Sequence, residues 1–120
     1  MNRYFLGFSV CVTTALFLSS CTKTNVEDEF PCSQVEIKYS TDIQPILDAS
    51  CVSCHNTSSP AAGLDFSTFS DSEKTAKDGS LLGSIEHQAN YTPMPLNSPK
   101  LNDCQILTII TWINEGSNNN

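Results

Sequence analysis

The sequence predicts a small all-α fold of three to four short helices. Apolar residues recur every three to four positions over residues 43–47 and 106–113, which is the pattern of helices with one buried face. No stretch alternates apolar and polar side chains convincingly enough to predict a strand. A chain of 120 residues has room for one domain with some flanking segments.

The first predicted helix leads into residue 51. Thr41 stands three positions before Gln44, which is the spacing of a capping box and marks a helix start. Pro45 then falls in the first turn, where a helix tolerates proline. The apolar side chains over 43–47 give this helix its buried face.

Three further segments have helical signals. The charged stretch 71–77 favours a short exposed helix that ends at Gly79. Ser80 is then placed to cap a helix whose leucines and isoleucine over 81–85 share one face. The strongest helical pattern, over 106–113, closes the domain.

Capping and stop signals delimit this last helix. Asn102 precedes Gln105 at capping-box spacing, and Gly116 ends the apolar pattern. Trp112 lies beside the apolar stripe, where it can pack against the first helix or against the edge of a cofactor.

The residues Cys51-Val52-Ser53-Cys54-His55 form the signal for covalent attachment of c-type haem. Each thiol adds across a vinyl group of the porphyrin, and one helical turn separates two sulfurs by about the distance between the vinyls. The adjacent histidine can then swing beneath the iron and bind it from the proximal side.

The loop after this motif is expected to orient the histidine ring. A ligating imidazole donates its other ring hydrogen to an acceptor, commonly a backbone carbonyl, and we expect that carbonyl near Pro60. Leu64, Phe66 and Phe69 are spaced to fold against the porphyrin, although the same positions suit an ordinary core.

Three other interpretations of the motif compete with haem. A redox dithiol usually lies on a βαβ unit, which this sequence does not indicate. A zinc site usually takes four ligands in paired clusters, and no second CxxC or HxxxH pair exists here. A structural disulfide across two residues would not require the histidine. The motif therefore favours haem attachment.

Met94 is the second candidate ligand and the only methionine outside residues 1–20. Pro93 and Pro95 hold it in an extended loop, and a thioether on a stiff loop suits a sixth iron ligand that raises the reduction potential. A gap-filling core methionine is the alternative, against which the prolines argue. His87 is a further candidate distal ligand, but a lone histidine near a helix C-terminus is more often a polar surface group.

Residues 1–20 have the parts of a lipoprotein signal peptide. Arg3 precedes an apolar run over residues 4–18, too short to span a bilayer comfortably, and small residues then precede Cys21. This ending resembles a bacterial lipobox, in which the cysteine is lipidated; an ordinary signal peptide with a chance cysteine is the alternative. We expect a lipid anchor in the cell envelope, with the outer membrane favoured because Thr22 is not acidic, facing the periplasm or the cell surface.

The predicted mature chain is acidic. Removing residues 1–20 leaves five Lys and Arg against 13 Asp and Glu, a net charge of −8, which argues against nucleic acid or anionic membrane as electrostatic partners. Residues 21–36 are predicted to form an acidic linker. The folded domain is expected over 37–117, with a polar tail at 118–120.

The cysteine count indicates one further pairing. Of six cysteines, Cys11 leaves with the signal peptide, Cys21 takes lipid and two serve the haem motif, so Cys32 and Cys104 remain. An even remainder in an exported protein favours a disulfide, and closing a loop of about 72 residues stabilises by on the order of 4 kcal/mol. Two separate buried or reactive thiols are the alternative.

The order of helix, CxxCH, loop, helix, Met-Pro loop and terminal helix resembles a class I cytochrome c over residues 38–116. Residues 42–47 and 101–104 are similar to segments of small monohaem bacterial lipoproteins. The resemblance implies a small cytochrome c fold with its helices wrapped round one covalent haem. It also implies a bridge between Cys32 and Cys104.

The same resemblance assigns the site residues. It implies that Cys51 and Cys54 are the thioether sites, that His55 is the proximal iron ligand and that Met94 is the distal one. The strong acidity departs from the basic docking surface of the best-known soluble members.

The expected function is that of a one-electron carrier and not an enzyme, because both axial positions of the iron are filled. Its partners would be redox proteins of the cell envelope, with the membrane contacted through the lipid anchor. A ligand-binding or sensing haem protein with a displaceable distal ligand is the alternative. A haem-free lipoprotein with a chance CxxCH motif also stays open.

Overall fold

The computed structural model describes residue 32 and residues 36–120. The predicted signal peptide, the predicted lipidation site Cys21 and nearly all of the predicted linker lie outside these residues. The described elements, in chain order, are η1 (Tyr39–Ile43), α2 (Gln44–Ser50), β1 (His55–Asn56), β2 (Ser59–Pro60), η2 (Ala61–Gly63), α3 (Phe69–Lys77), α4 (Ser80–Ile85) and α5 (Asp103–Asn114).

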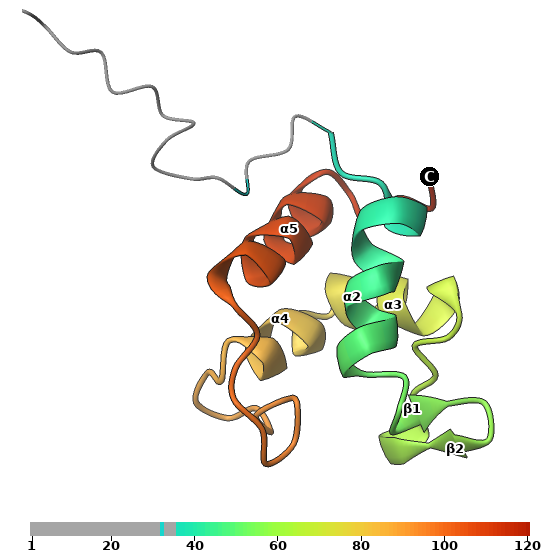
Figure 1. Ribbon diagram of the computed structural model, residues 1–120, viewed down its shortest axis with the longest axis vertical. Helices are drawn as coiled ribbons and strands as arrows, with labels where there is room; N and C mark the ends of the chain where they lie inside the picture. Colours follow the sequence, from blue (N-terminus) through green and yellow to red (C-terminus); the bar gives the residue numbers. More distant parts are fainter. Residues whose placement is uncertain (1–31, 33–35) are drawn as a thin grey trace, which may run out of the picture.

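The described fold is rich in helices, as the sequence predicts (Figure 1). Helices α2, α3, α4 and α5 surround one core, and the short β1–β2 ladder lies beyond the end of α2. Within the part of the chain that the structure describes, no helix has the length and apolar character needed to cross a membrane. The core consists of Ile37, Tyr39, Ile43, Leu47, Phe66, Ala76, Leu81, Ile85, Leu101, Ile106, Ile109 and Trp112.

An aromatic cluster joins the first and last helices. The ring of Tyr39 meets Phe69 edge-on with centroids 4.8 Å apart, and it lies 5.5 Å from the ring of Trp112. Trp112 is 1% exposed, so it packs against the first helix as its position beside the apolar stripe suggests. These contacts hold α5 against η1.

The start of the first helix differs from the prediction. The chain becomes helical at Tyr39 as the π-helical turn η1, so Thr41 lies inside a helical segment and the predicted Thr41–Gln44 capping box is wrong. Gln44 instead accepts a hydrogen bond of 2.6 Å from the Tyr39 hydroxyl and donates to the carbonyl of Phe66. Pro45 does fall in the first turn of α2.

The middle helices follow the predicted order with shifted starts. Helix α3 begins at Phe69, two residues before the predicted start. The predicted cap at Ser80 is wrong, because Gly79, with a φ of 81°, occupies the N-cap of α4 and Ser80 is already helical. Asp78 accepts from the Ser80 N–H at 2.9 Å, and hydrogen bonding by Ser80 lowers the pKa of the Asp78 carboxyl.

The last helix has the predicted cap. Asn102 accepts from the N–H of Gln105 at 2.9 Å, and the Gln105 side chain accepts from the N–H of Asn102 at 3.2 Å, which completes a capping box. A disulfide joins Cys32 to Cys104 in the first turn of α5 across a separation of 72 residues. This is the pairing that the cysteine count predicts, and it fixes the chain before the domain to its last helix.

The final residues are held by the domain, although composition alone suggests a tail. The carbonyl of Asn118 accepts from the Trp112 indole N–H at 2.9 Å. Asn120 accepts from the N–H of Tyr39 at 2.8 Å and from the N–H of Ser40 at 3.2 Å. The C-terminal end therefore lies beside η1 (Figure 1).

Candidate functional site

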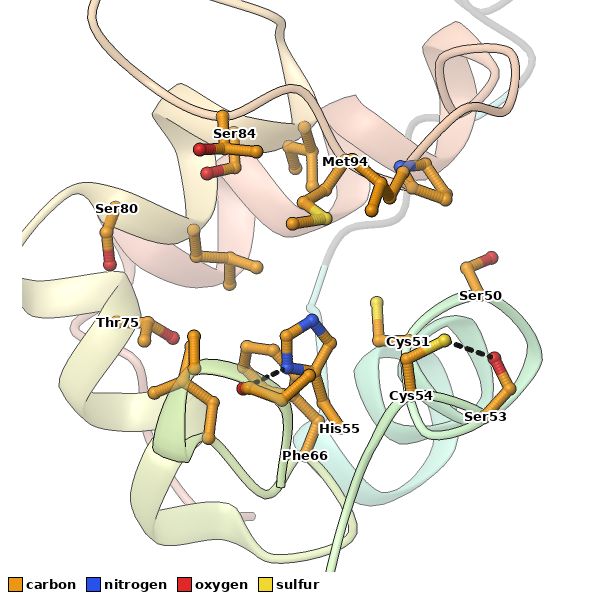
Figure 2. A pocket seen from close by; sticks show the side chains of 18 of the residues that line it. Ser50, Cys51, Ser53, Cys54, His55, Phe66, Thr75, Ser80, Ser84 and Met94 are labelled. Atoms are coloured by element: carbon orange, nitrogen blue, oxygen red, sulfur yellow. Dashed lines mark hydrogen bonds between the residues drawn. The ribbon is translucent and has the colours of Figure 1, made fainter. Parts of the chain in front are cut away.

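A cavity of about 620 Å³ opens between the end of α2, the loop that follows it, helix α4 and the segment 92–98. Its size is within the range of about 300–1,000 Å³ that is typical of cofactor and small-molecule sites. Its lining includes all four residues for which the sequence predicts a role in haem binding: Cys51, Cys54, His55 and Met94. The fold thus brings residues from positions 51 to 94 together around one space (Figure 2).

His55 is fixed by its backbone and by its ring. Its N–H donates to the carbonyl of Cys51 at 2.9 Å, and its carbonyl accepts from the N–H of Phe66 at 2.9 Å. Its side chain is 8% exposed and packs edge-on against the Phe66 ring, with centroids 5.4 Å apart. The imidazole therefore has little freedom to rotate.

The imidazole also has a defined tautomer. Its Nδ1 lies 2.9 Å from the carbonyl oxygen of Ala61, and because a carbonyl can only accept, Nδ1 carries the hydrogen. Nε2 is then left with its lone pair, and Figure 2 shows this nitrogen directed into the cavity. Ala61 follows Pro60, so the acceptor lies where the sequence places it.

A two-residue ladder, which the sequence does not predict, brings that carbonyl to the ring. His55 pairs with Pro60 and Asn56 with Ser59 in antiparallel register. Strands this short contain no alternation of apolar and polar residues, so pattern analysis cannot detect them. The side-chain oxygen of Asn56 accepts from the N–H groups of Ser58 and Ser59, each at 3.0 Å, which closes the turn.

The two cysteines of the motif differ in environment. Cys51 is half-buried and Cys54 is exposed, and both are free thiols one helical turn apart, with the N–H of Cys54 donating to the carbonyl of Cys51 at 3.1 Å. Burial raises the pKa of the Cys51 thiol to about 11. Reactive redox cysteines need the opposite shift, because the thiolate is the nucleophile. This environment is unfavourable to the redox-dithiol interpretation.

Met94 lies on the opposite wall from His55. Its N–H donates to the carbonyl of Ser84 at 3.0 Å, which attaches the loop to α4. Figure 2 shows its sulfur turned into the cavity, on the side that faces the His55 ring. His87 does not line the cavity; its Nε2 is hydrogen-bonded to the Met94 carbonyl at 3.0 Å instead.

The remaining walls divide into apolar and hydroxyl-bearing parts. Leu64 and Phe66 line the cavity, which agrees with the prediction that they fold against a cofactor. Phe69 does not line it; this half-buried residue packs against Tyr39 at the edge of the core. Figure 2 shows Ser50 and Ser53 near the two cysteines, and three further hydroxyl residues on the side of the cavity away from them. These residues are Thr75, Ser80 and Ser84.

The sequence predicts an acceptor carbonyl near Pro60 without selecting Ala61, and it does not indicate these hydroxyl residues as parts of the site. Serine and threonine at isolated positions have no motif, and a backbone carbonyl has no sequence signature. One weak signal existed: Ser84 follows Leu81 by three positions, so both occupy the same face of α4.

Comparison with known proteins adds no assignment: no family model, no curated protein and no solved structure matches this chain. Over residue 32 and residues 36–120, no three His, Cys, Asp or Glu side chains gather in a group that could hold a metal ion. The site is therefore interpreted from its own geometry.

Proposed function

We propose that this chain is a c-type cytochrome of the class I type that acts as a one-electron carrier. The observation that carries the proposal is the pair His55 and Met94, on facing walls of a cofactor-sized cavity whose lining also holds Cys51 and Cys54. One nitrogen donor, one sulfur donor and two thiols at CxxCH spacing are the side chains that a covalent haem requires.

The residues present fit this cofactor. Each thiol would add across one vinyl group, with the sulfur bonding to one vinyl carbon and the hydrogen going to the other, so the reaction needs no oxidant. Porphyrin carboxylates lie at the edge opposite the vinyl groups. The hydroxyls of Ser80 and Ser84, which line the side away from Cys51 and Cys54, are suited to donate hydrogen bonds to them.

Haem supplies the one-electron chemistry when bound, because its iron alternates between the ferrous and ferric states. The protein's part is to hold both donors in place before and after the electron moves. His55 is held by Ala61 and Phe66, and Met94 is held through its backbone by Ser84. If His55 and Met94 both bind the iron, no coordination position would be left for a substrate, which would favour a carrier over an enzyme.

The cellular setting is inferred from the sequence alone. A signal peptide over residues 1–20, followed by Cys21 as the lipidated first residue, supports a lipid-anchored protein of the bacterial cell envelope, outside the cytoplasm. Redox proteins of that compartment are the expected partners, and the acidity of the chain favours neutral or basic docking surfaces over nucleic acid.

Carbon monoxide binding tests the proposed ligation and separates it from the sensing alternative. The wild type, Met94→Ala and a control, Leu96→Ala, would be produced in a host that attaches haem. Leu96 lines the cavity but is 61% exposed and has no donor atom, so its removal leaves the iron ligands intact.

We expect the reduced wild type and the Leu96→Ala variant to bind carbon monoxide slowly without denaturant, because Met94 occupies the iron. Met94→Ala should bind it rapidly. Rapid binding by the wild type, equal to that of Met94→Ala, would contradict the carrier proposal and favour a ligand-binding haem protein.

A further inference from the structure

We propose that His87 is a positioning residue for Met94, and that Gly83 and Tyr91 complete a clamp that holds the methionine loop on α4. This inference rests on the proposed function, since it concerns the ligand that Met94 would supply. Its basis is a set of contacts between the end of α4 and residues 91–94 that no motif in the sequence indicates.

Both backbone polar groups of Met94 are hydrogen-bonded to residues in or just after the last turn of α4. The N–H donates to the carbonyl of Ser84 at 3.0 Å, and the carbonyl accepts from Nε2 of His87 at 3.0 Å. Because the carbonyl can only accept, Nε2 of His87 carries a hydrogen. The peptide groups on either side of Met94 are therefore fixed, and only the thioether side chain can still rotate.

His87 lies in the left-handed turn that ends α4, the usual C-cap geometry, and this turn carries its side chain toward Met94. Its φ is 57°, in the left-handed region that costs an ordinary residue about 1–2 kcal/mol. Hydrogen bonds from the N–H of His87 to the carbonyl of Ser84 and from Gln88 to the carbonyl of Gly83 hold this turn. Asparagine and histidine are both enriched in this region, but of the two only histidine is long enough to reach the Met94 carbonyl from here.

Tyr91 is the second part of the clamp. A Cβ added to Gly83 would lie 2.5–2.6 Å from three atoms of the Tyr91 ring, so the ring rests directly on the bare backbone of α4. The N–H of Tyr91 donates to the carbonyl of Gln88 at 3.2 Å. The loop is therefore attached to α4 at two points: the ring of Tyr91 packs on Gly83, and three residues later the N–H of Met94 donates to Ser84.

These contacts give His87 a role that differs from that of an iron ligand. It acts through Met94, by fixing the peptide from which the thioether reaches into the cavity. Without the hydrogen bond, the loop around Met94 becomes freer to move, and the sulfur leaves the iron more often. The iron–sulfur contact would then weaken while His55 and the thioether sites stay unchanged.

Two substitutions at His87 test the hydrogen bond. His87→Gln places an amide N–H as far along the side chain as the imidazole Nε2, so it can still donate to the Met94 carbonyl. His87→Asn suits the positive φ better but is too short to reach. Both would be made in the haem-loaded protein, with circular dichroism to establish that the helices are retained.

The readouts are the methionine-to-iron absorption band of the oxidised protein, its loss on heating, and the rate of carbon monoxide binding after reduction. We expect His87→Asn to lose the band at a lower temperature and to bind carbon monoxide faster by on the order of tenfold. His87→Gln should stay close to the wild type. Equal values for wild type and His87→Asn, or equal losses in both variants, would overturn the assignment.

Gly83→Ala tests the other part of the clamp without touching His87. The added methyl would displace the Tyr91 ring, so the band should weaken; Gly83→Ala combined with Tyr91→Ala removes the clash and should recover part of it. No change in Gly83→Ala would overturn the role of Tyr91. A haem-loaded wild type that lacks the band would overturn the proposed function and this inference together, whereas a wild type with the band and an unaffected His87→Asn would overturn this inference alone.

Discussion

Nδ1 of His55 lies 2.9 Å from the carbonyl oxygen of Ala61, six residues further along the chain. That single contact decides which ring nitrogen is available to a metal. It depends on a tight turn, because Ala62 has a φ of 55° and Gly63 has a φ of 74°. The backbone conformation of η2 therefore determines the orientation of His55, the candidate proximal ligand.

The turn at η2 should be sensitive to side-chain branching. Gly63→Val places a branched side chain at a positive φ, and we expect it to lower the free energy of unfolding by about 1–2 kcal/mol. Ala62→Gly relieves the neighbouring left-handed residue and should be neutral or slightly stabilising. Urea unfolding of the haem-loaded proteins measures both; equal stability of Gly63→Val and wild type would contradict the role of this turn.

The buried hydroxyl of Tyr39 should stabilise the contact between η1 and α3. It donates to Gln44 at 2.6 Å and lies 3.1 Å from the hydroxyl oxygen of Ser72, whose side chain is fully buried. Tyr39→Phe keeps the ring, so the expected loss is about 1–2 kcal/mol from the unpaired polar atoms. Tyr91→Phe, at an exposed tyrosine, is the matched control and should change stability by less than about 0.5 kcal/mol.

The benefit of the Tyr39 hydroxyl should decrease at high pH. Burial raises the pKa of Tyr39 above its ordinary value of 10.0, with a smaller upward contribution from Asp48, against which the hydrogen bond with Ser72 acts. The unfolded chain then loses its proton first, so the stability that the neutral hydroxyl provides is complete below about pH 10 and is lost as the pH rises through the native pKa.

Urea unfolding of wild type and Tyr39→Phe at about pH 8 and about pH 11 measures this effect. The difference in unfolding free energy between the two proteins should shrink at the higher pH. A constant difference would show that the Tyr39 hydroxyl titrates as it does in the unfolded chain, and a growing difference would show that folding lowers its pKa; either result would contradict the prediction.

Removing the disulfide should lower the stability of the protein without affecting haem attachment. Cys32→Ser with Cys104→Ser removes a link across 72 residues, and we expect the free energy of unfolding to fall by about 4 kcal/mol with haem content unchanged. Absorbance of the haem and urea unfolding measure the two quantities. Loss of haem attachment in a still folded protein would contradict the assignment of this pair as purely structural.

Local signals were enough to predict part of this fold. The capping box of Asn102 and Gln105 needs only residues that are close in sequence, and it forms as predicted. The cap predicted at Thr41 fails because contacts of Tyr39 with Phe69 and Trp112, distant in sequence, favour an earlier helix start. Spacing rules do not include such tertiary contacts.

The candidate site also has some residues that the sequence predicts and others that only the folded structure shows. Cys51, Cys54 and His55 are adjacent in sequence, so one motif identifies them, and the prolines beside Met94 mark it as unusual. The residues that hold these side chains have no such signature. The sequence predicts a carbonyl near Pro60, but only the folded β1–β2 turn identifies it as that of Ala61. The contacts of Gly83 and His87 become visible only when residues 91–94 are folded onto α4.

The most direct test is the intact mass of the chain produced in a host that attaches c-type haem, alongside the variant in which Cys51 and Cys54 are both serine. We predict that the wild type carries the added mass of one covalently bound haem beyond any lipid, and that the variant carries none. A wild-type mass equal to that of the bare polypeptide with its lipid would contradict the central claim.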